Sequence, residues 1–184
     1  MKLQIKSLGI VGSRLLTQQV HIDSRGAFEI FWDQASLANT DLLFRPSNAH
    51  HSYNAKAETN RAFHFQRPPY GQSKLVSCVT GRVWDFILDL RPESPTFRQW
   101  EHVELTPVSG KSVYIPSGCA HGFATLEDNT TLAYLIEGDF RPESSAAVRW
   151  NDPELGIDWP VRNPILSDKD QHAMDLDSYL RSLC

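Results

Sequence analysis

Turn-forming residues divide this chain into short pieces, and their spacing limits what it can fold into. Brief apolar runs are separated by clusters of Gly, Pro, Asn, Asp and Ser. The clusters recur at intervals of about 8 to 12 residues, which is typical of an all-β sandwich or barrel. We therefore expect an all-β fold made of short strands joined by tight turns.

The segment 82–90, RVWDFILDL, shows strand alternation clearly. Successive side chains of a strand point to opposite faces of its sheet. One face would carry Trp84, Phe86, Leu88 and Leu90. The other face would carry Val83, Asp85, Ile87 and Asp89. Further strands are predicted in the segments 26–32, 74–81, 102–108, 112–116 and 130–138.

The C-terminal segment 166–183 follows a different period. Ala173, Leu176, Leu180 and Leu183 are spaced as on one face of a helix. Ser167 followed by Asp170 resembles a capping box, with Asp in place of the usual Glu or Gln. Together these patterns predict a β-sandwich of two antiparallel sheets, a jelly roll, with a short C-terminal helix.

Length and charge narrow the class further. A chain of 184 residues fits one domain, residues 1–184. Its net charge of -4 offers no basic stripe for nucleic acid. Its three cysteines are odd in number and far apart, which favours reduced thiols and a cytoplasmic location. We expect no signal peptide and no membrane segment.

The segment 110–121, GKSVYIPSGCAH, resembles the second motif of the cupins, which ends at His121. Metal-binding cupins carry two histidines and a glutamate in their first motif. Here only His64 remains, because Gln66 and Lys74 stand at the other two places. Two imidazoles beside a lysine make a poor site for a divalent metal. We therefore expect no metal, although a metal-dependent cupin stays open as an alternative.

His64 and Lys74 suit another chemistry. An imidazole can remove a proton next to a carbonyl, and a fixed ammonium can stabilise the resulting enolate oxygen. The chain therefore has residues for proton transfer where related folds hold a metal. A non-catalytic sugar-binding jelly roll, the third alternative, would not need these groups together.

Beyond these residues, most of the chain, from about residue 18 to 171, resembles the dTDP-4-dehydrorhamnose 3,5-epimerases, which are nucleotide-sugar epimerases of the cupin superfamily. The motifs that carry the resemblance are DSRGAF, RAFHFQRPP, KLV, GRVWDFILDLRPESPTF, YIPSGCAHGFATL, AYLIEGDFRPE, WNDPELGIDWP and LSDKD. The resemblance implies an isomerase that acts on a dTDP-linked 4-keto-6-deoxyhexose and needs no cofactor. It also implies a homodimer in which N-terminal strands extend the partner's sheet.

The resemblance assigns four catalytic roles. His64 would be the base, and Asp170 would be its carboxylate partner, with Asp168 as the alternative. Lys74 would hold the C4 oxygen. Tyr134 would return a proton to the opposite face. The predicted substrate-binding residues are Arg25, Phe28, Arg61, Gln66, Asp85 and His121.

Four positions depart from the usual family pattern. Ala62 and Phe63 replace Gly and Leu beside the base, and we expect them to reshape the pocket wall. Phe140 replaces a tyrosine, and Ile30 replaces a glutamate. We expect inversion at both C3 and C5, with inversion at a single centre as the alternative.

Overall fold

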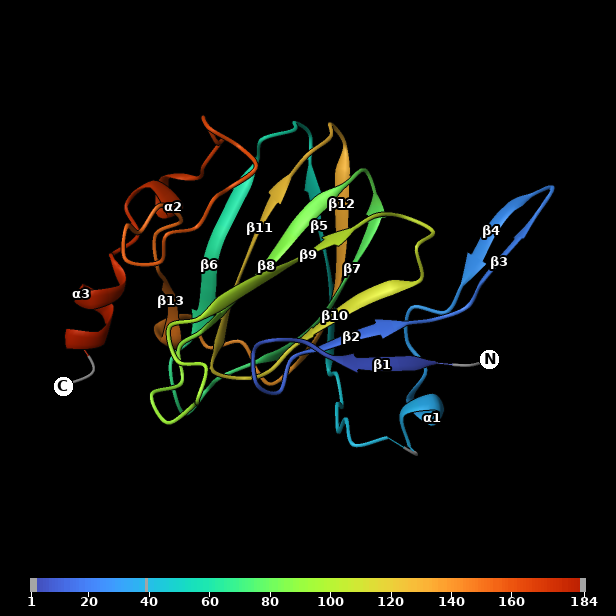
Figure 1. Cartoon of the computed structure of the whole chain (residues 1–184), viewed down its shortest axis with the longest axis horizontal. Helices are drawn as coiled ribbons and strands as arrows, with labels where there is room; N and C mark the ends of the chain where they lie inside the picture. The colour runs from blue at the N-terminus through green and yellow to red at the C-terminus, as the bar shows by residue number, and fades with distance from the viewer. Residues whose placement is uncertain (1–2, 39, 183–184) are drawn as a thin grey trace.

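The computed structural model describes residues 3–38 and 40–182, and its regular structure consists mostly of β-strands (Figure 1). The first sheet has the strand order β1 (Gln4–Ser7), β2 (Arg14–Thr17), β10 (Lys111–Ile115), β7 (Ser73–Thr80), β12 (Thr130–Glu137) and β5 (Asn48–Asn54). The second has the order β13 (Ser145–Ala147), β6 (Asn60–Gln66), β11 (Cys119–Thr125), β8 (Val83–Asp89) and β9 (Trp100–Leu105). All pairings within the two sheets are antiparallel. The prediction of an all-β sandwich is confirmed.

The remaining elements are short. A separate hairpin, β3 (Val20–Asp23) and β4 (Gly26–Glu29), projects away from the sandwich in Figure 1. The helices are α1 (Gln34–Leu37), the 3₁₀ helix η1 (Pro142–Ser144), α2 (Asp168–Gln171) and α3 (Leu176–Arg181). No helix in the described part of the chain is long and apolar enough to cross a membrane.

Strand β8 is buried on both faces, because a packed layer lies on each side of its sheet. Phe86 and Leu88 belong to a cluster that the C-terminal segment covers through Trp159 and Tyr179. Ile87 belongs to a second cluster, to which strands of both sheets contribute. The alternation predicted for this strand is therefore confirmed, and the side chains on both of its faces are part of the core.

The C-terminal helix differs from the prediction, since it is two helices rather than one. The Ser167 hydroxyl accepts from the Asp170 amide at 3.2 Å, as the capping box predicts. The backbone of Met174 then accepts from the Arg149 amide at 2.9 Å, and Asp175 caps α3. These contacts use backbone groups that a continuous helix would need. Leu183, the last predicted helical position, lies outside the described residues.

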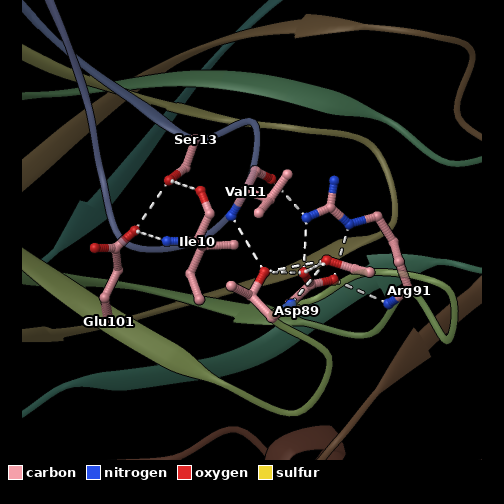
Figure 2. A network of polar contacts seen from close by, with 8 residues as sticks. Ile10, Val11, Ser13, Asp89, Arg91 and Glu101 are labelled. Carbon is pink, nitrogen blue, oxygen red and sulfur yellow. Dashed lines mark hydrogen bonds and ion pairs between the residues drawn. The ribbon is translucent and has the colours of Figure 1, made fainter.

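A buried carboxylate joins the N-terminal turn to the end of β8 (Figure 2). Asp89 accepts from Nε and Nη2 of Arg91, at 2.8 and 2.7 Å, and from the hydroxyls of Ser94 and Thr96. Arg91 also donates to the carbonyl of Val11 at 2.6 Å. Burial by itself would raise the pKa of Asp89, but these hydrogen bonds outweigh it and lower the pKa to about 2.

Replacing Asp89 with asparagine should lower the free energy of unfolding by about 3 kcal/mol at pH 7, because it removes a buried charge partner. A carboxylate with a lowered folded pKa stabilises the protein above its unfolded pKa. In the native protein this contribution should disappear as the pH falls from about 4 towards about 2. Urea unfolding measures both effects. Asp41→Asn removes an exposed partner of Arg14 and serves as the control. Equal unfolding midpoints for the two variants would contradict the role given to Asp89.

Candidate active site

A cavity of about 290 Å³ opens between the two sheets. Strands β5, β7 and β12 of the first sheet form one wall, and β6 and β11 of the second form the other. Its lining residues are His50, His51, Ser52, Arg61, His64, Lys74, His121, Phe123, Tyr134 and Ile136. Each ionisable lining residue except Tyr134 is basic, so the cavity suits an anionic ligand.

A β-bulge in β6 brings two of these residues to the same wall. The strand partners shift from His121 and His64 to Phe123 and Arg61, so two residues of β6, Ala62 and Phe63, lie opposite one of β11, Gly122. In a regular strand, residues three apart face opposite sides. Because of the bulge, Arg61 and His64 both line the cavity.

The same bulge corrects the expectation for Ala62 and Phe63. Both are fully buried in the cluster under the C-terminal segment, and the Phe63 ring lies 5.7 Å from that of Trp159. Neither residue lines the cavity. On the neighbouring strand β11, position 122 has to be glycine, because a Cβ there would lie 2.8 Å from the Cβ of Ala62. The larger side chains therefore fill the core rather than reshape the pocket wall.

His64 and Asp170 form a closely bonded pair. Nε2 of His64 lies 2.5 Å from Oδ1 of Asp170, whose side chain is 2% exposed. The other carboxylate oxygen accepts from the Ser167 hydroxyl at 2.9 Å. With Nε2 engaged, Nδ1 is the ring nitrogen left to take a proton. Asp170 therefore both orients the ring and contributes to the start of α2, while no bond joins Asp168 to His64 among the described residues.

Lys74, Asp85 and His121 form a group of ionisable side chains at the inner end of the cavity. Nε2 of His121 lies 2.8 Å from Oδ2 of Asp85, and Asp85 is fully buried. Burial lowers the pKa of Lys74 to about 8, against the opposing effect of the Asp85 charge. Burial also lowers the pKa of His121, which favours the neutral imidazole. The surroundings of Lys74 therefore stabilise its ammonium only weakly. The ammonium is suited to bind an oxygen that becomes negative during a reaction.

Tyr134 projects from the wall opposite His64. It lies on β12 of the first sheet, whereas His64 lies on β6 of the second. Its ring meets that of His121 edge-on, with centroids 5.8 Å apart. Burial raises the pKa of the phenol, and the charge of Asp85 adds to this effect. Tyr134 therefore keeps its proton at neutral pH and can act as a donor.

Four predicted substrate-binding residues do not line this cavity within one chain: Arg25, Phe28, Gln66 and Asp85, of which Asp85 is fully buried. The Gln66 amide is occupied by backbone: Nε2 donates to the carbonyls of Tyr70 and Asp139, and Oε1 accepts from the Arg141 amide. Arg25 and Phe28 lie on the projecting hairpin, 88% and 63% exposed. For Gln66 the structure corrects the prediction, because its polar atoms hold the loops around the cavity instead.

The two remaining departures from the family pattern also lie outside the cavity lining. Phe140 is 62% exposed and borders a smaller chamber of about 60 Å³ with Gln66 and Lys74. Ile30 follows β4 and is partly buried. Phe140 and Lys74 therefore share the lining of this smaller chamber.

Sequence reasoning missed the contribution of β5. His50, His51 and Ser52 line the cavity from this strand, and Phe123 lines it from β11. The paired histidines in the polar stretch before Arg61 were a visible signal, but only strand pairing places them beside Tyr134. The described residues contain no group of three or more His, Cys, Asp or Glu side chains arranged to hold a metal.

Comparison with known proteins agrees with this geometry. A family model described as dTDP-4-dehydrorhamnose 3,5-epimerase matches residues 7–178. A Streptomyces niveus dTDP-4-dehydrorhamnose 3-epimerase is 38% identical, over 94% of this chain and 83% of the relative. A Mycobacterium tuberculosis dTDP-4-dehydrorhamnose 3,5-epimerase is 36% identical, over 93% of this chain and 86% of the relative.

Among solved structures, the dTDP-4-dehydrorhamnose 3,5-epimerase of Bacillus anthracis, with TDP and PPi bound, superposes with a TM-score of 0.91. It is 35% identical in sequence, and the match covers 95% of this chain and all of the other. The fold, the motifs and the extent of these matches lead to one conclusion: the chain belongs to the dTDP-4-dehydrorhamnose 3,5-epimerase family, a family of isomerases with the cupin jelly-roll fold.

Proposed function

We propose that this protein inverts C3 and C5 of dTDP-4-dehydro-6-deoxyglucose, giving dTDP-4-dehydrorhamnose, with neither a metal nor a redox cofactor. The observation that carries the proposal is the composition of one cavity. A carboxylate-bonded histidine lines one wall, a partly buried phenol lines the other, and a lysine lies at the inner end. This set has a base, an acid and an oxygen-binding cation, which are the three groups that an epimerisation beside a ketone needs.

The ketone at C4 acidifies the hydrogens on C3 and C5, so each centre can lose its proton to a base. Nδ1 of His64 takes the proton, and Asp170 stabilises the imidazolium. The electron pair moves onto the C4 oxygen, where Lys74 holds the negative charge. Tyr134 then protonates the carbon from the opposite wall, which inverts the centre. Phenolate and imidazolium return to their starting states by proton exchange with solvent.

The test is NMR of dTDP-4-dehydro-6-deoxyglucose incubated with the protein in heavy water. We expect deuterium at both C3 and C5 and a product of the L configuration. The Streptomyces niveus relative is a 3-epimerase by name, so a single-centre reaction is the second candidate. Deuterium confined to C3 after long incubation would support that candidate and reject inversion at both centres. No deuterium at either carbon would reject the enzyme altogether.

Replacing Tyr134 with phenylalanine should separate exchange from inversion. The base remains, so deuterium can still enter from the His64 side with retention of configuration. Inversion should slow by about 10² to 10⁴, the usual effect of losing a general acid. Stereochemical analysis of the deuterated sugar measures the two processes in one sample. Inversion at the native rate would place the acid elsewhere.

We also propose a homodimer in which the β3–β4 hairpin reaches the partner's cavity. An isolated two-stranded hairpin is marginally stable in water, so this one needs a surface to pack on. It exposes Ile22 and Phe28 at 74% and 63%, and it carries Arg25. A partner would cover the apolar side chains and would bring the arginine to a diphosphate.

Cys78 and Cys119 are buried free thiols, which suits the cytoplasmic location expected from the sequence.

Mixing two defective variants tests the dimer. We expect His64→Ala and Arg25→Ala each to be impaired alone, and activity to return when they are mixed and allowed to exchange subunits. A mixed dimer has one site with both native residues, because each site takes His64 from one chain and Arg25 from the other. Light scattering should give twice the chain mass. A monomeric mass, or no recovery on mixing, would reject this arrangement.

A further inference from the structure

A second cavity, a groove of about 220 Å³, lies on the C-terminal side of the molecule. Residues of β13, α2 and α3, which are neighbours in Figure 1, line it together with Arg67, the residue that follows β6. The groove shares no lining residue with the cavity that contains His64. The proposed epimerisation does not use it, so its side chains need a separate explanation.

Two permanent positive charges lie in this groove, those of Arg67 and Lys169, and no Asp or Glu lines it. Neither cation is part of an ion pair within the described part of the chain. The chain as a whole is acidic, with 22 Asp and Glu against 18 Lys and Arg. The groove therefore has the opposite charge to the chain, and its two cations attract an anion.

Both cations keep hydrogen-bond donors for a ligand. Nζ of Lys169 donates to the Ser145 hydroxyl at 3.1 Å, and Nη2 of Arg67 donates to the Glu143 carbonyl at 3.3 Å. An ammonium has three N–H donors and a guanidinium has five, so each side chain is held beside the groove with most of its donors unused. A guanidinium fork also matches the spacing of phosphate oxygens.

Tyr179 is an independent indication of a ligand. Its side chain is 3% exposed, and its ring meets that of Phe65 edge-on with centroids 4.9 Å apart. Tyr179 also lines the groove, and its hydroxyl makes no hydrogen bond within residues 3–38 and 40–182. A tyrosine hydroxyl usually has a hydrogen-bond partner when the residue is buried. This one has a donor to offer beside two cations.

From these observations we infer that the groove is a second binding site, which takes a small anion bearing a phosphate group. Arg67 and Lys169 pair with the phosphate oxygens, and the Tyr179 hydroxyl donates to one of them. The groove is smaller than the pockets of drug-sized ligands, which begin at about 300 Å³, so it fits a phosphate with at most a small organic part. The inference does not depend on the proposed function.

Calorimetry with phenyl phosphate, a phosphate group on a small ring, tests the inference. We expect the native protein to bind it, and Arg67→Gln and Lys169→Gln each to bind it about two- to fivefold more weakly, the effect of one exposed ion pair. The double variant should bind it more weakly than either. Lys169→Arg keeps the charge and should bind as the native protein does. Tyr179→Phe keeps the ring and should weaken binding about two- to tenfold through loss of the hydroxyl alone.

Inorganic phosphate in the same experiment distinguishes a free phosphate ion from a phosphate ester. Ala146, Ala173 and Met174 add apolar surface to the groove. Tighter binding of phenyl phosphate would show that this surface contacts an organic group, and the ligand is then an ester. Equal affinities would show that the phosphate group alone is recognised.

Two control variants locate the bound probe. Lys56→Gln removes an exposed cation that is paired with Asp128 outside both cavities, and Arg61→Gln removes a cation from the cavity around His64. Both should bind phenyl phosphate as the native protein does. If Arg61→Gln weakens binding and Lys169→Gln does not, the probe occupies the cavity around His64 and the inference is overturned. Absence of binding to the native protein, or native affinity in the double variant, would also overturn it. Deuterium exchange into the ketosugar is measured separately, so the proposed function can hold or fail by itself.

Discussion

Replacing His64 with alanine is expected to abolish deuterium exchange at both C3 and C5 of the ketosugar. In the proposed mechanism, one imidazole, held by Asp170 at 2.5 Å, is the base for both abstractions. Loss of a general base typically lowers the rate by about 10² to 10⁴, so exchange should fall close to background at both carbons together. NMR in heavy water follows the two carbons separately and measures both losses in one experiment.

The matched control for this substitution is His172→Ala. His172 is an exposed histidine just after α2, and its Nδ1 contacts a backbone carbonyl outside the cavity. The His172→Ala variant should exchange deuterium at both C3 and C5 at the native rate. Loss of exchange at only one carbon in His64→Ala would mean that a second base serves the other carbon. Near-native exchange at both would remove His64 from the mechanism.

Replacing Lys74 with methionine should lower kcat by about 10² to 10³, the usual effect of losing one preorganised group that stabilises an oxyanion. Methionine is similar in shape and carries no charge, so packing around the cavity should survive. Burial lowers the pKa of Lys74 to about 8. The ammonium is therefore lost as pH rises through about 8, and native activity should decline there.

The pH profile separates the role of Lys74 in catalysis from a structural one. In Lys74→Met the decline near pH 8 should be absent from the residual activity, because the ammonium responsible for it has been removed. Lys74→Arg keeps the charge at all pH values and should regain part of the rate without the decline. A variant Lys74→Met with more than half the native kcat, or with an unchanged profile, would contradict the assignment.

Much of the fold could be predicted from local patterns. The alternation in 82–90 predicted which side chains share each face of a strand, and the structure confirms it. Ser167 was predicted as a helix cap, and it caps α2. These features depend on neighbouring residues and on strand period, and both are present in the sequence itself.

The kinds of reactive side chain in the site could also be predicted from the sequence. His64, Lys74 and Tyr134 were selected from motifs in one linear sequence, and all three line one cavity. Their roles stay predictions until the substitutions above are made. The bonded partner of His64 was identified as well, although 106 positions separate it from Asp170. That pairing came from the resemblance to a family, because nothing in the spacing of the two residues implies it.

Other features depended on contacts that no local pattern encodes. The bulge in β6 turns Ala62 and Phe63 into the core and keeps Arg61 beside His64, because Gly122 on a strand about 60 positions away leaves room for it. Gln66 bonds to loop backbone rather than lining the cavity, since the loops at 70 and 139 meet there. His50 reaches the cavity because β5 pairs with β12. The sequence by itself determined strand periodicity, turns, caps and the types of reactive groups, which are short-range properties of the chain. Only the tertiary structure decided which side chains share the cavity, because register and bulges are set by pairing between distant strands.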